Sequence, residues 1–467
     1  MARRERWVAL TTLAMLQAVT IATGVYAVTN DFSLGALTRR TPQPDVPAEP
    51  PPVPVITAGP VLASGGDGPL PTKGTLTRQL TTALGDKALG DRVGAVVLDA
   101  ATGEPIFAAN ADAGITPAST TKVVTCVAAL ASLGPDARLS TRVVQGRTAG
   151  SIVLVGGGDP TLAGPSAKPG AYPKQASLAV LASRTAAALK KAGQTKVTLS
   201  YDASLFTGPV FGPGWKPNYV PEGNVAPVSA LAIDEGRQHP SSSTPRVSDP
   251  ARFAATAFAR LLGKYGIGVA KTVRPAKAPA GTAELGEVMS APVYALVERA
   301  LTQSDNDLSE ALARHVALKE GRPGSFEGAS KATMEVLGRL GASKGIQVHD
   351  GSGLSTRNRI SADGLARLLA VAAGSRHPGL RPVLSGMPIA GFTGTLGHRF
   401  TRSDSKSEVG IVRAKTGTLN NVNTLAGLAT TRDGRLVTFA FMADRVPPGW
   451  GKAEAALDRL AAIVARS

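Results

Sequence analysis

The sequence predicts an α/β protein in which an antiparallel sheet is flanked by helices and a second domain, rich in short strands, is inserted into the chain. Two observations support this fold class. Helix-like and strand-like hydrophobic patterns alternate from about residue 75 onward, which favours a mixed architecture. Between residues 141 and 287 the pattern changes to short strands separated by many Gly/Pro turns. With 467 residues, 43% of them hydrophobic, the chain is long enough for at least two folded units.

The N-terminal segment, residues 1–30, has the pattern of a transmembrane anchor or a signal peptide. Three arginines within the first six residues precede the uncharged stretch Trp7–Thr29. A helix needs roughly 20 apolar residues to cross a bilayer, and flanking basic residues stay in the cytoplasm. Val25–Ala27 resembles a small-residue cleavage site, so a cleaved signal peptide stays open. Both alternatives export the chain, to the outer face of the cytoplasmic membrane or to the periplasm or cell wall.

Residues 31–72 read as a linker. Residues 41–60, TPQPDVPAEPPPVPVITAGP, are rich in proline, which fixes φ and removes the backbone donor. Such a segment is an extended, semi-rigid spacer. We expect residues 73–140 and 288–467 to form one domain, with residues 141–287 inserted between its two parts.

The expected elements of the first domain follow from periodicity and from helix and strand stop signals. The sequence predicts one helix and then two strands around a Thr-Gly turn in residues 76–111. A helix follows from Ser119 to Leu133, which Gly134 and Pro135 terminate. Further helices are expected over 292–302, 306–320, 325–340 and 361–373, strands over 425–431 and 436–444, and a closing helix over 451–467.

Composition excludes several classes of function. Lys and Arg outnumber Asp and Glu by 51 to 34, a net charge of +17, which suits anionic surroundings or simply gives a basic surface. Neither zinc-finger spacing nor a basic run interleaved with aromatic residues is present, so no nucleic-acid partner is expected. The single cysteine, Cys126, and five scattered histidines indicate no metal site, and no cofactor is expected.

The first candidate motif is Ser119-Thr120-Thr121-Lys122. Residues at i and i+3 share one face of a helix, so the Lys122 amine can reach the Ser119 hydroxyl. Serine needs an adjacent base to act as a nucleophile, and a lysine kept neutral by burial can be that base. Ser403–Lys406 has the same spacing but lies in a polar run, where a solvated turn is expected.

A second motif, Ser304-Asp305-Asn306, lies between two predicted helices. A hydroxyl and a carboxamide there can pass on a proton and hold an amide, although helix capping alone explains these residue types. The third motif, Lys415-Thr416-Gly417-Thr418, opens an apolar strand. A strand edge offers backbone groups to a peptide, and the lysine and hydroxyls suit a carboxylate.

Taken in order, the three motifs resemble the set found in penicillin-binding proteins and serine β-lactamases. The chain is similar to the D-alanyl-D-alanine carboxypeptidase/endopeptidase family of low-molecular-mass penicillin-binding proteins, which carry an insert between the first two motifs. The gap between Ser119 and Ser304 is shorter than in members with the largest inserts. Matching stretches are GGGDPTL (156–162), YDASLF (201–206), PVSAL (227–231), DGSGLS (350–355) and GTLGHRF (394–400).

This resemblance implies the penicillin-recognising serine transferase fold, an acyl-enzyme mechanism and a role for each motif residue. Peptidoglycan peptides ending in D-Ala-D-Ala are the implied substrates, and β-lactams the implied covalent inhibitors. The base Lys122 must be neutral, so burial and Lys415 are expected to lower its pKa. The implied catalytic residues are Ser119 (nucleophile), Lys122 (base), Ser304, Asn306 and Lys415, and the implied substrate-binding residues are Thr416, Gly417 and Thr418.

Two alternatives remain from the sequence. A β-lactamase-like hydrolase is the nearer one, although the Glu-x-x-x-Asn deacylating pattern of class A enzymes is absent from the sequence. A non-catalytic cell-wall-binding scaffold is the other, and the intact Ser119/Lys122 pair argues against it. His349 and Asp350, close to Ser352 and Ser355, have the residue types of a Ser-His-Asp triad. Neighbours along one strand point to opposite faces, so these residues are not expected to form one. DGSGLS (350–355) is therefore interpreted as a structural turn close to the site.

Overall fold

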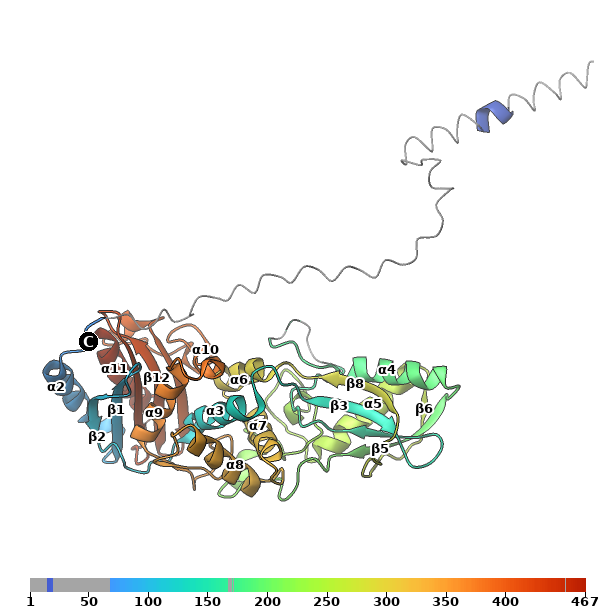
Figure 1. The fold of residues 1–467 in the computed structure, drawn as a ribbon, viewed down its shortest axis with the longest axis horizontal. Coiled ribbons are helices and arrows are strands. Elements are labelled where there is room, and N and C mark those ends of the chain that lie inside the picture. The colour runs from blue at the N-terminus through green and yellow to red at the C-terminus, as the bar shows by residue number, and fades with distance from the viewer. Residues whose placement is uncertain (1–14, 20–67, 167–169, 171, 450) are drawn as a thin grey trace, which may run out of the picture. The chain divides into compact units, whose positions relative to one another are not determined.

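The computed structural model describes residues 15–19, 68–166, 170, 172–449 and 451–467 (Figure 1). Residues 64–467 form one compact unit, which contains all three motifs. The predicted N-terminal segment and linker lie almost wholly outside the described residues. Among the residues that are described, no helix has the length and apolar character needed to cross a membrane.

The first sheet joins both ends of this unit and is antiparallel throughout, as the sequence predicts. Its strand order is β11-β12-β13-β1-β2, so strands near the C-terminus pair with strands that precede the first motif. This order leaves β11, which carries the third motif, at an edge of the sheet. The strands are β1 (Val93–Asp99), β2 (Pro105–Ala109), β11 (Val412–Leu419), β12 (Val422–Thr430) and β13 (Leu436–Ala443).

Helices cover both faces of this sheet. Helices α2 (Lys73–Leu84) and α11 (Lys452–Arg466) share a hydrophobic core with Phe439 of β13. The next strand residue, Thr438, points to the other face, where its hydroxyl donates to the carbonyl of Ala366 at 3.1 Å. Ala366 belongs to α9 (Ala362–Ala373). The period of two along the strand therefore separates the two helical layers.

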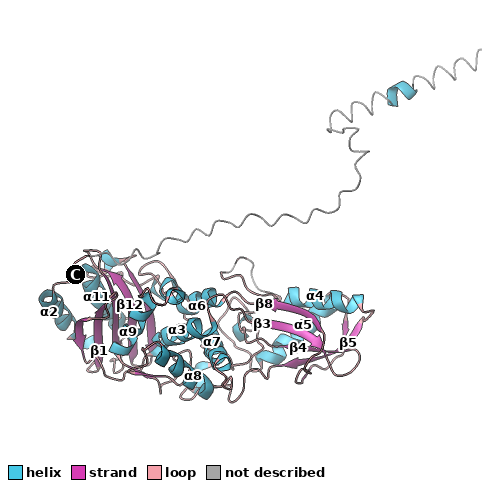
Figure 2. Ribbon diagram, in the orientation of Figure 1, coloured by secondary structure: helices cyan, strands magenta, loops and turns pink. Residues whose placement is uncertain are grey.

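A group of helices lies between the two sheets (Figure 2). Ten of the 13 residues of α3 (Thr121–Leu133) are buried, and α3 packs against the other three members of the group. These are α6 (Val293–Thr302), α7 (Asn306–Lys319) and α8 (Phe326–Arg339), which agree with the predicted helices to within one or two residues.

The second sheet is formed by residues 140–289, called the insert below, and this segment has its own hydrophobic core. Its order is β6-β5-β4-β3-β8, with β7 also pairing with β5, and the pairs that β5 makes are parallel. The strands are short, as predicted: β3 (Ser140–Gln145), β4 (Ser151–Val155), β5 (Lys196–Asp202), β6 (Gly268–Val269), β7 (Arg274–Pro275) and β8 (Glu284–Met289).

Two helices that the sequence analysis did not anticipate pack on this sheet. They are α4 (Leu178–Lys191) and α5 (Pro250–Lys264), and both contribute to the core of the insert. Parallel neighbours such as β4 and β5 need a crossover connection, which α4 supplies. The surrounding Gly/Pro turns dominated the composition of the segment, and this hid two alanine-rich amphipathic stretches.

Candidate active site

Ser119 lies in a strained turn that leads into α3. It occupies the middle of the 3-10 turn Ala118–Thr120 and is half-buried. Ala118 has φ 49°, a left-handed conformation that is uncommon for a residue other than glycine. Gly353 packs against this turn so closely that a Cβ there would lie 1.9 Å from the Ala118 carbonyl oxygen. The DGSGLS loop therefore contacts the turn that presents Ser119.

Lys122 is fully buried, and its Nζ has three oxygen partners. It lies 3.0 Å from Ser119 Oγ, 2.6 Å from Asn306 Oδ1 and 2.6 Å from the carbonyl oxygen of Ser352. Burial lowers the pKa of Lys122 to about 8, and the carboxylates of Asp350 and Glu310 oppose that shift. A lysine with this pKa exchanges its proton near neutral pH, whereas an exposed lysine does not.

Two buried carboxylates, those of Glu310 and Asp350, lie near the Lys122 amine. Glu310 Oε1 accepts hydrogen bonds from the backbone N–H groups of Gly351 (3.1 Å) and Ser352 (2.8 Å). Burial, reinforced by Asp350, raises the pKa of Glu310 to about 7. Glu310 also pairs with Arg314 at 3.4 Å. This arrangement fixes the Ser352 carbonyl, which is one of the three partners of Lys122.

Asp350 organises the rest of the DGSGLS loop. Its carboxylate accepts from the backbone N–H of Ser355 (2.6 Å), from Asn358 Nδ2 (2.7 Å) and from Trp215 Nε1 (2.8 Å). Trp215 comes from the inserted segment. The interpretation of this loop as a structural turn beside the site is therefore confirmed, with one addition: its backbone at Ser352 contacts Lys122 directly.

Asn306 links Lys122 to the insert. Its Oδ1 accepts from Lys122, and its Nδ2 donates to the carbonyl oxygen of Asn224 at 2.7 Å. Asp305 caps α7 by accepting from the N–H of Leu308 at 3.0 Å, so capping and a place in the site occur in the same motif. Ser304 has φ 56° and is half-buried; within the described residues no hydrogen bond joins it to Ser119 or Lys122.

An ion-pair network behind the second motif holds it to the insert. Arg299 contacts Asp305 at 3.3 Å and also pairs with Glu235, a buried carboxylate of the insert. Arg246 of the insert pairs with Asp307 at 3.2 Å. Oxygen atoms of the three carboxylates lie within 4.8 Å of one another, a spacing that suits a metal ion. Because guanidinium groups already balance these charges, the cluster is an ion-pair network rather than a cation site.

Lys415 occupies a different environment from Lys122. It is fully buried, and its Nζ donates to the carbonyl oxygen of Thr416 at 2.9 Å. Burial, followed by repulsion from Lys122, lowers the pKa of Lys415 well below its usual value. Lys122 and Lys415 lie close enough for each positive charge to disfavour the other, and burial is the main cause that lowers the pKa of both lysines.

The rest of the third motif presents a strand edge. Thr416 Oγ1 lies 2.7 Å from Thr395 Oγ1, whereas Thr418 is exposed. A Cβ at Gly417 would lie 2.5 Å from the carbonyl oxygen of Pro117, two residues before Ser119. Glycine therefore allows β11 to pack against the turn that carries the first motif.

Comparison with known proteins identifies the chain. Residues 76–246 and 237–464 match the D-Ala-D-Ala carboxypeptidase 3 (S13) family. The chain belongs to this family.

Relatives of this S13 carboxypeptidase cover most of its length. It is 38% identical over 420 residues to a carboxypeptidase of Mycobacterium tuberculosis, with 88% of both proteins covered. It is also 38% identical over 423 residues to the carboxypeptidase DacB of Mycolicibacterium smegmatis, covering 89% of this chain and 90% of that protein. The crystal structure of penicillin binding protein 4 from Haemophilus influenzae shares its fold, with a TM-score of 0.68 at 24% identity over 84% of this chain and 98% of that one.

As a member of this family, the chain is a serine-type D-alanyl-D-alanine carboxypeptidase. Its fold is that of the penicillin-recognising serine hydrolases. The structure brings Ser119, Lys122 and Asn306 together and places Lys415 beside them. The other motif residues lie on the same turns and strand.

The second Ser-x-x-Lys match lies apart from these motifs. Asp404 accepts from Arg459 of α11, and Ser405 is 1% exposed. The expected solvated turn is therefore wrong for Ser405, because the turn packs against α11. Cys126 is a core thiol, and burial raises its pKa to about 12.

Sequence reasoning missed several parts of the site. Ser352 carried a signal, because DGSGLS was already placed near the site. No signal in the sequence pointed to the Asn224 carbonyl or to Glu235. Both lie in the insert, far along the chain from Asn306 and Arg299, which they contact.

Proposed function

We propose that the chain is an exported serine D-alanyl-D-alanine carboxypeptidase/endopeptidase that cleaves peptidoglycan stem peptides through an acyl-enzyme and is inhibited by β-lactams. The observation that carries this proposal is the buried Lys122 amine, in contact with both the Ser119 hydroxyl and Asn306. Its basic N-terminal residues and the Trp7–Thr29 stretch support export, with membrane attachment or cleavage as the two alternatives.

The surroundings of Lys122 define the direction of the first proton transfer. A neutral amine has two N–H groups and one lone pair. Asn306 Oδ1 and the Ser352 carbonyl are acceptors only, so they hold both N–H groups. The lone pair then faces Ser119 Oγ, the remaining neighbour. As the Oγ–carbon bond to the penultimate D-alanine forms, the hydroxyl proton moves to Lys122.

The second half of acylation needs a proton donor and a site for the oxyanion. The C–N bond breaks, and the leaving D-alanine amine takes up a proton, for which Lys122 with Ser304 is the route. The backbone N–H groups of Ser119 and Thr418 are the proposed oxyanion donors, an effect often worth several kcal/mol. Water then hydrolyses the acyl-enzyme and releases the shortened peptide.

The terminal carboxylate of the substrate is assigned to the third motif. Thr416 and Thr418 supply hydroxyls, and Lys415 supplies an amine next to them. Burial and Lys122 lower the pKa of Lys415 in the free protein, and a bound carboxylate would favour its protonated form. The motif then distinguishes peptides with a free C-terminus from uncharged esters.

The decisive test is mass spectrometry of the full chain after incubation with penicillin. We expect a single adduct on the peptide that contains Ser119, and we expect Ser119→Ala to abolish it without loss of folded structure. Ser403→Ala, at the second Ser-x-x-Lys match, is the control and should keep the adduct. An adduct on another serine would refute the assignment, and rapid release of hydrolysed penicillin would favour the β-lactamase alternative.

A further inference from the structure

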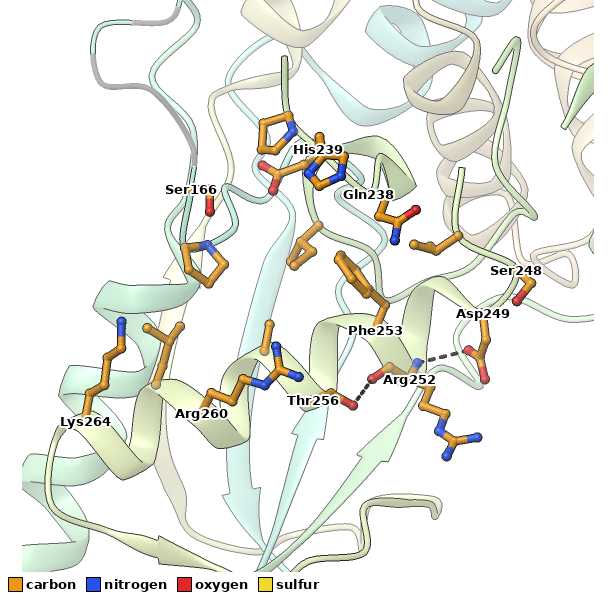
Figure 3. A pocket seen from close by; sticks show the side chains of 17 residues that line it. Ser166, Gln238, His239, Ser248, Asp249, Arg252, Phe253, Thr256, Arg260 and Lys264 are labelled. Carbon is orange, nitrogen blue, oxygen red and sulfur yellow. Dashed lines mark hydrogen bonds between the residues drawn. The ribbon is translucent and has the colours of Figure 1, made fainter. Parts of the chain in front are cut away.

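A cavity of about 750 Å³ lies in the insert along α5, among residues outside the three motifs. Its volume falls within the range of roughly 300–1,000 Å³ that is usual for small-ligand sites. Arg260 extends from α5 toward the loop that carries Gln238 and His239, and Lys264 extends on the side of Ser166 (Figure 3). Arg252 points away from the pocket. The cavity therefore has a wall of basic side chains facing a polar loop.

The two cations of this wall lack a counter-ion in the described part of the chain. Arg260 and Lys264 are exposed and one helical turn apart, and neither side chain forms an ion pair or hydrogen bond within the described residues. Asp249, which also lines the cavity, caps α5 by accepting from the N–H of Arg252 at 3.0 Å. Two unpaired cations on one wall attract an anionic group from a ligand.

Asp234 adds a second, independent feature. This cavity-lining residue is 8% exposed, and its Oδ1 accepts from the N–H of Gly164 at 3.0 Å. Its other carboxyl oxygen has no hydrogen-bond partner among the described residues. Burial raises the pKa of Asp234, and its second carboxyl oxygen is a hydrogen-bond partner that a ligand hydroxyl can use.

The backbone around Asp234 is strained. Asp234, Glu235 and Gly236 have φ values of 49°, 57° and 67°, a run of left-handed residues held by bonds from their N–H groups. Such residues persist only where the surrounding structure fixes them. The same turn sends Glu235 to Arg299, so the cavity and the second motif share one rigid segment.

We propose that this cavity binds a segment of a cell-wall glycan, through a sugar ring and a carboxylate of the stem peptide attached to it. The acid group lies against Arg260 and Lys264, a sugar hydroxyl bonds to Asp234, and the ring packs on Phe253, which is half-buried in the cavity wall. The identity of the polymer rests on the proposed function, because the stem peptides attached to the sugars of peptidoglycan carry free carboxylates. The insert then holds the strand whose peptide is cleaved.

The test measures retention of the full chain on purified peptidoglycan from which phosphate polymers have been stripped. Ser119→Ala is used as the background, so that the peptidoglycan is not altered during the measurement. Adding Arg260→Glu with Lys264→Glu should weaken retention by about tenfold or more, since it places two anions beside the bound acid group.

The matched control is Lys191→Glu with Lys271→Glu. These exposed residues of the insert do not line the cavity, and the double change alters net charge by the same amount. We expect retention close to that of the Ser119→Ala background. Equal losses in both double variants would show a general charge effect and overturn the proposal. Retention that disappears when phosphate polymers are stripped would overturn the glycan assignment in favour of a phosphate ligand.

Asp234→Asn separates the cavity from surface charge. The variant keeps the size of the side chain, and its amide oxygen can still accept from the Gly164 N–H. An NH2 group replaces the second carboxyl oxygen, so the hydrogen bond to the sugar hydroxyl is altered and retention should fall. The charges of Arg260 and Lys264 stay the same. Unchanged retention would remove Asp234 from the site.

The proposed function is measured separately. With Ser119 intact, the cavity variants should be acylated by penicillin and should cleave a soluble D-Ala-D-Ala peptide at the wild-type rate, because none of the changed residues contacts Ser119 or Lys122. A wild-type chain that fails to cleave the peptide refutes the proposed function, while retention still decides the cavity.

Discussion

The start of α3 and the edge strand β11 each bury a lysine completely, yet the two lysines have opposite surroundings. Lys122 has three oxygen partners and the carboxylates of Asp350 and Glu310 nearby. Lys415 has one carbonyl oxygen partner and, as its main charged neighbour, Lys122. Burial alone therefore does not define the role of a lysine in this site.

The difference explains how one site can contain both a base and an anion receptor. Carboxylates behind Lys122 limit the effect of burial, so its pKa stays at about 8 and the amine remains a useful base near neutral pH. Lys415 has no such support, and burial together with Lys122 lowers its pKa well below the usual value. An incoming carboxylate stabilises the protonated form of this amine, because it supplies the negative counter-charge that the surroundings of Lys415 lack.

The largest effect is expected when Lys122 can no longer lose its proton. Lys122→Arg should lower the acylation rate by about 10²–10⁴-fold, because guanidinium stays protonated and cannot act as a base. The measurement is the rate of penicillin adduct formation by mass spectrometry. Lys406→Arg, at the exposed lysine of the second Ser-x-x-Lys match, should leave the rate unchanged. A Lys122→Arg protein that keeps most of its rate would make Lys122 a structural residue only.

The next effect sharpens the role of Lys415. Amidating the C-terminal D-alanine of a peptide substrate should lower kcat/KM by about one to two orders of magnitude, since charge-assisted hydrogen bonds contribute roughly 1.5–3 kcal/mol each. In Lys415→Ala this penalty should largely vanish, because the partner of the carboxylate is already lost. Small uncharged esters serve as the control substrate and should suffer less from Lys415→Ala. Equal cleavage of amidated and free-acid peptides by the wild-type protein would show that Lys415 does not bind the carboxylate.

The sequence was sufficient for the local parts of this comparison but not for the contacts that separate the two lysines. Helical spacing predicted that Lys122 would reach Ser119, and the third motif was expected at the start of a strand, whereas Lys415 lies in the interior of β11. Both expectations depend on neighbours along the chain, where periodicity is informative. Glu310 is one of many acidic residues on a helix, and nothing in its local pattern distinguishes it from an exposed one. Its effect on Lys122 arises only when α7 and the DGSGLS loop pack together.

The insert shows the same limit more strongly. The carbonyl of Asn224 contacts Asn306 through its backbone, which carries no side-chain signal at all. Glu235 reaches Arg299 from a strained turn that propensity rules disfavour. Helix α5 was hidden for a different reason, since its alanine-rich stripe lies among Gly/Pro turns. Long-range contacts of these kinds follow from tertiary packing and not from any single stretch of residues.

The smallest effect is expected when the surroundings of Lys122 are made more like those of Lys415. In Glu310→Gln the carbonyl of the new amide can still accept from the backbone of the DGSGLS loop, but the negative charge near Lys122 is gone. That charge favours the protonated amine, so its removal should lower the pKa of Lys122 below about 8.

The sign of the resulting change follows from the role of Lys122 as a base. Acylation rises with pH as Lys122 loses its proton, so a lower pKa moves this rise to lower pH. The quantity to compare is the acylation rate at pH 7 divided by the maximal rate of the same protein. This ratio should be about threefold higher in the variant than in the wild-type protein. Because the pKa of Glu310 is itself raised to about 7, its charge is present mainly over the range in which the wild-type rate is rising.

Glu327→Gln provides the control, since Glu327 is exposed and pairs only with Lys331 in the described part of the chain. Its pH profile should match that of the wild-type protein. A merely structural role of Glu310 would lower the rate equally at every pH and lower Tm, without moving the profile. If the Glu310→Gln profile stays in place, the difference between the two lysines does not arise from this carboxylate.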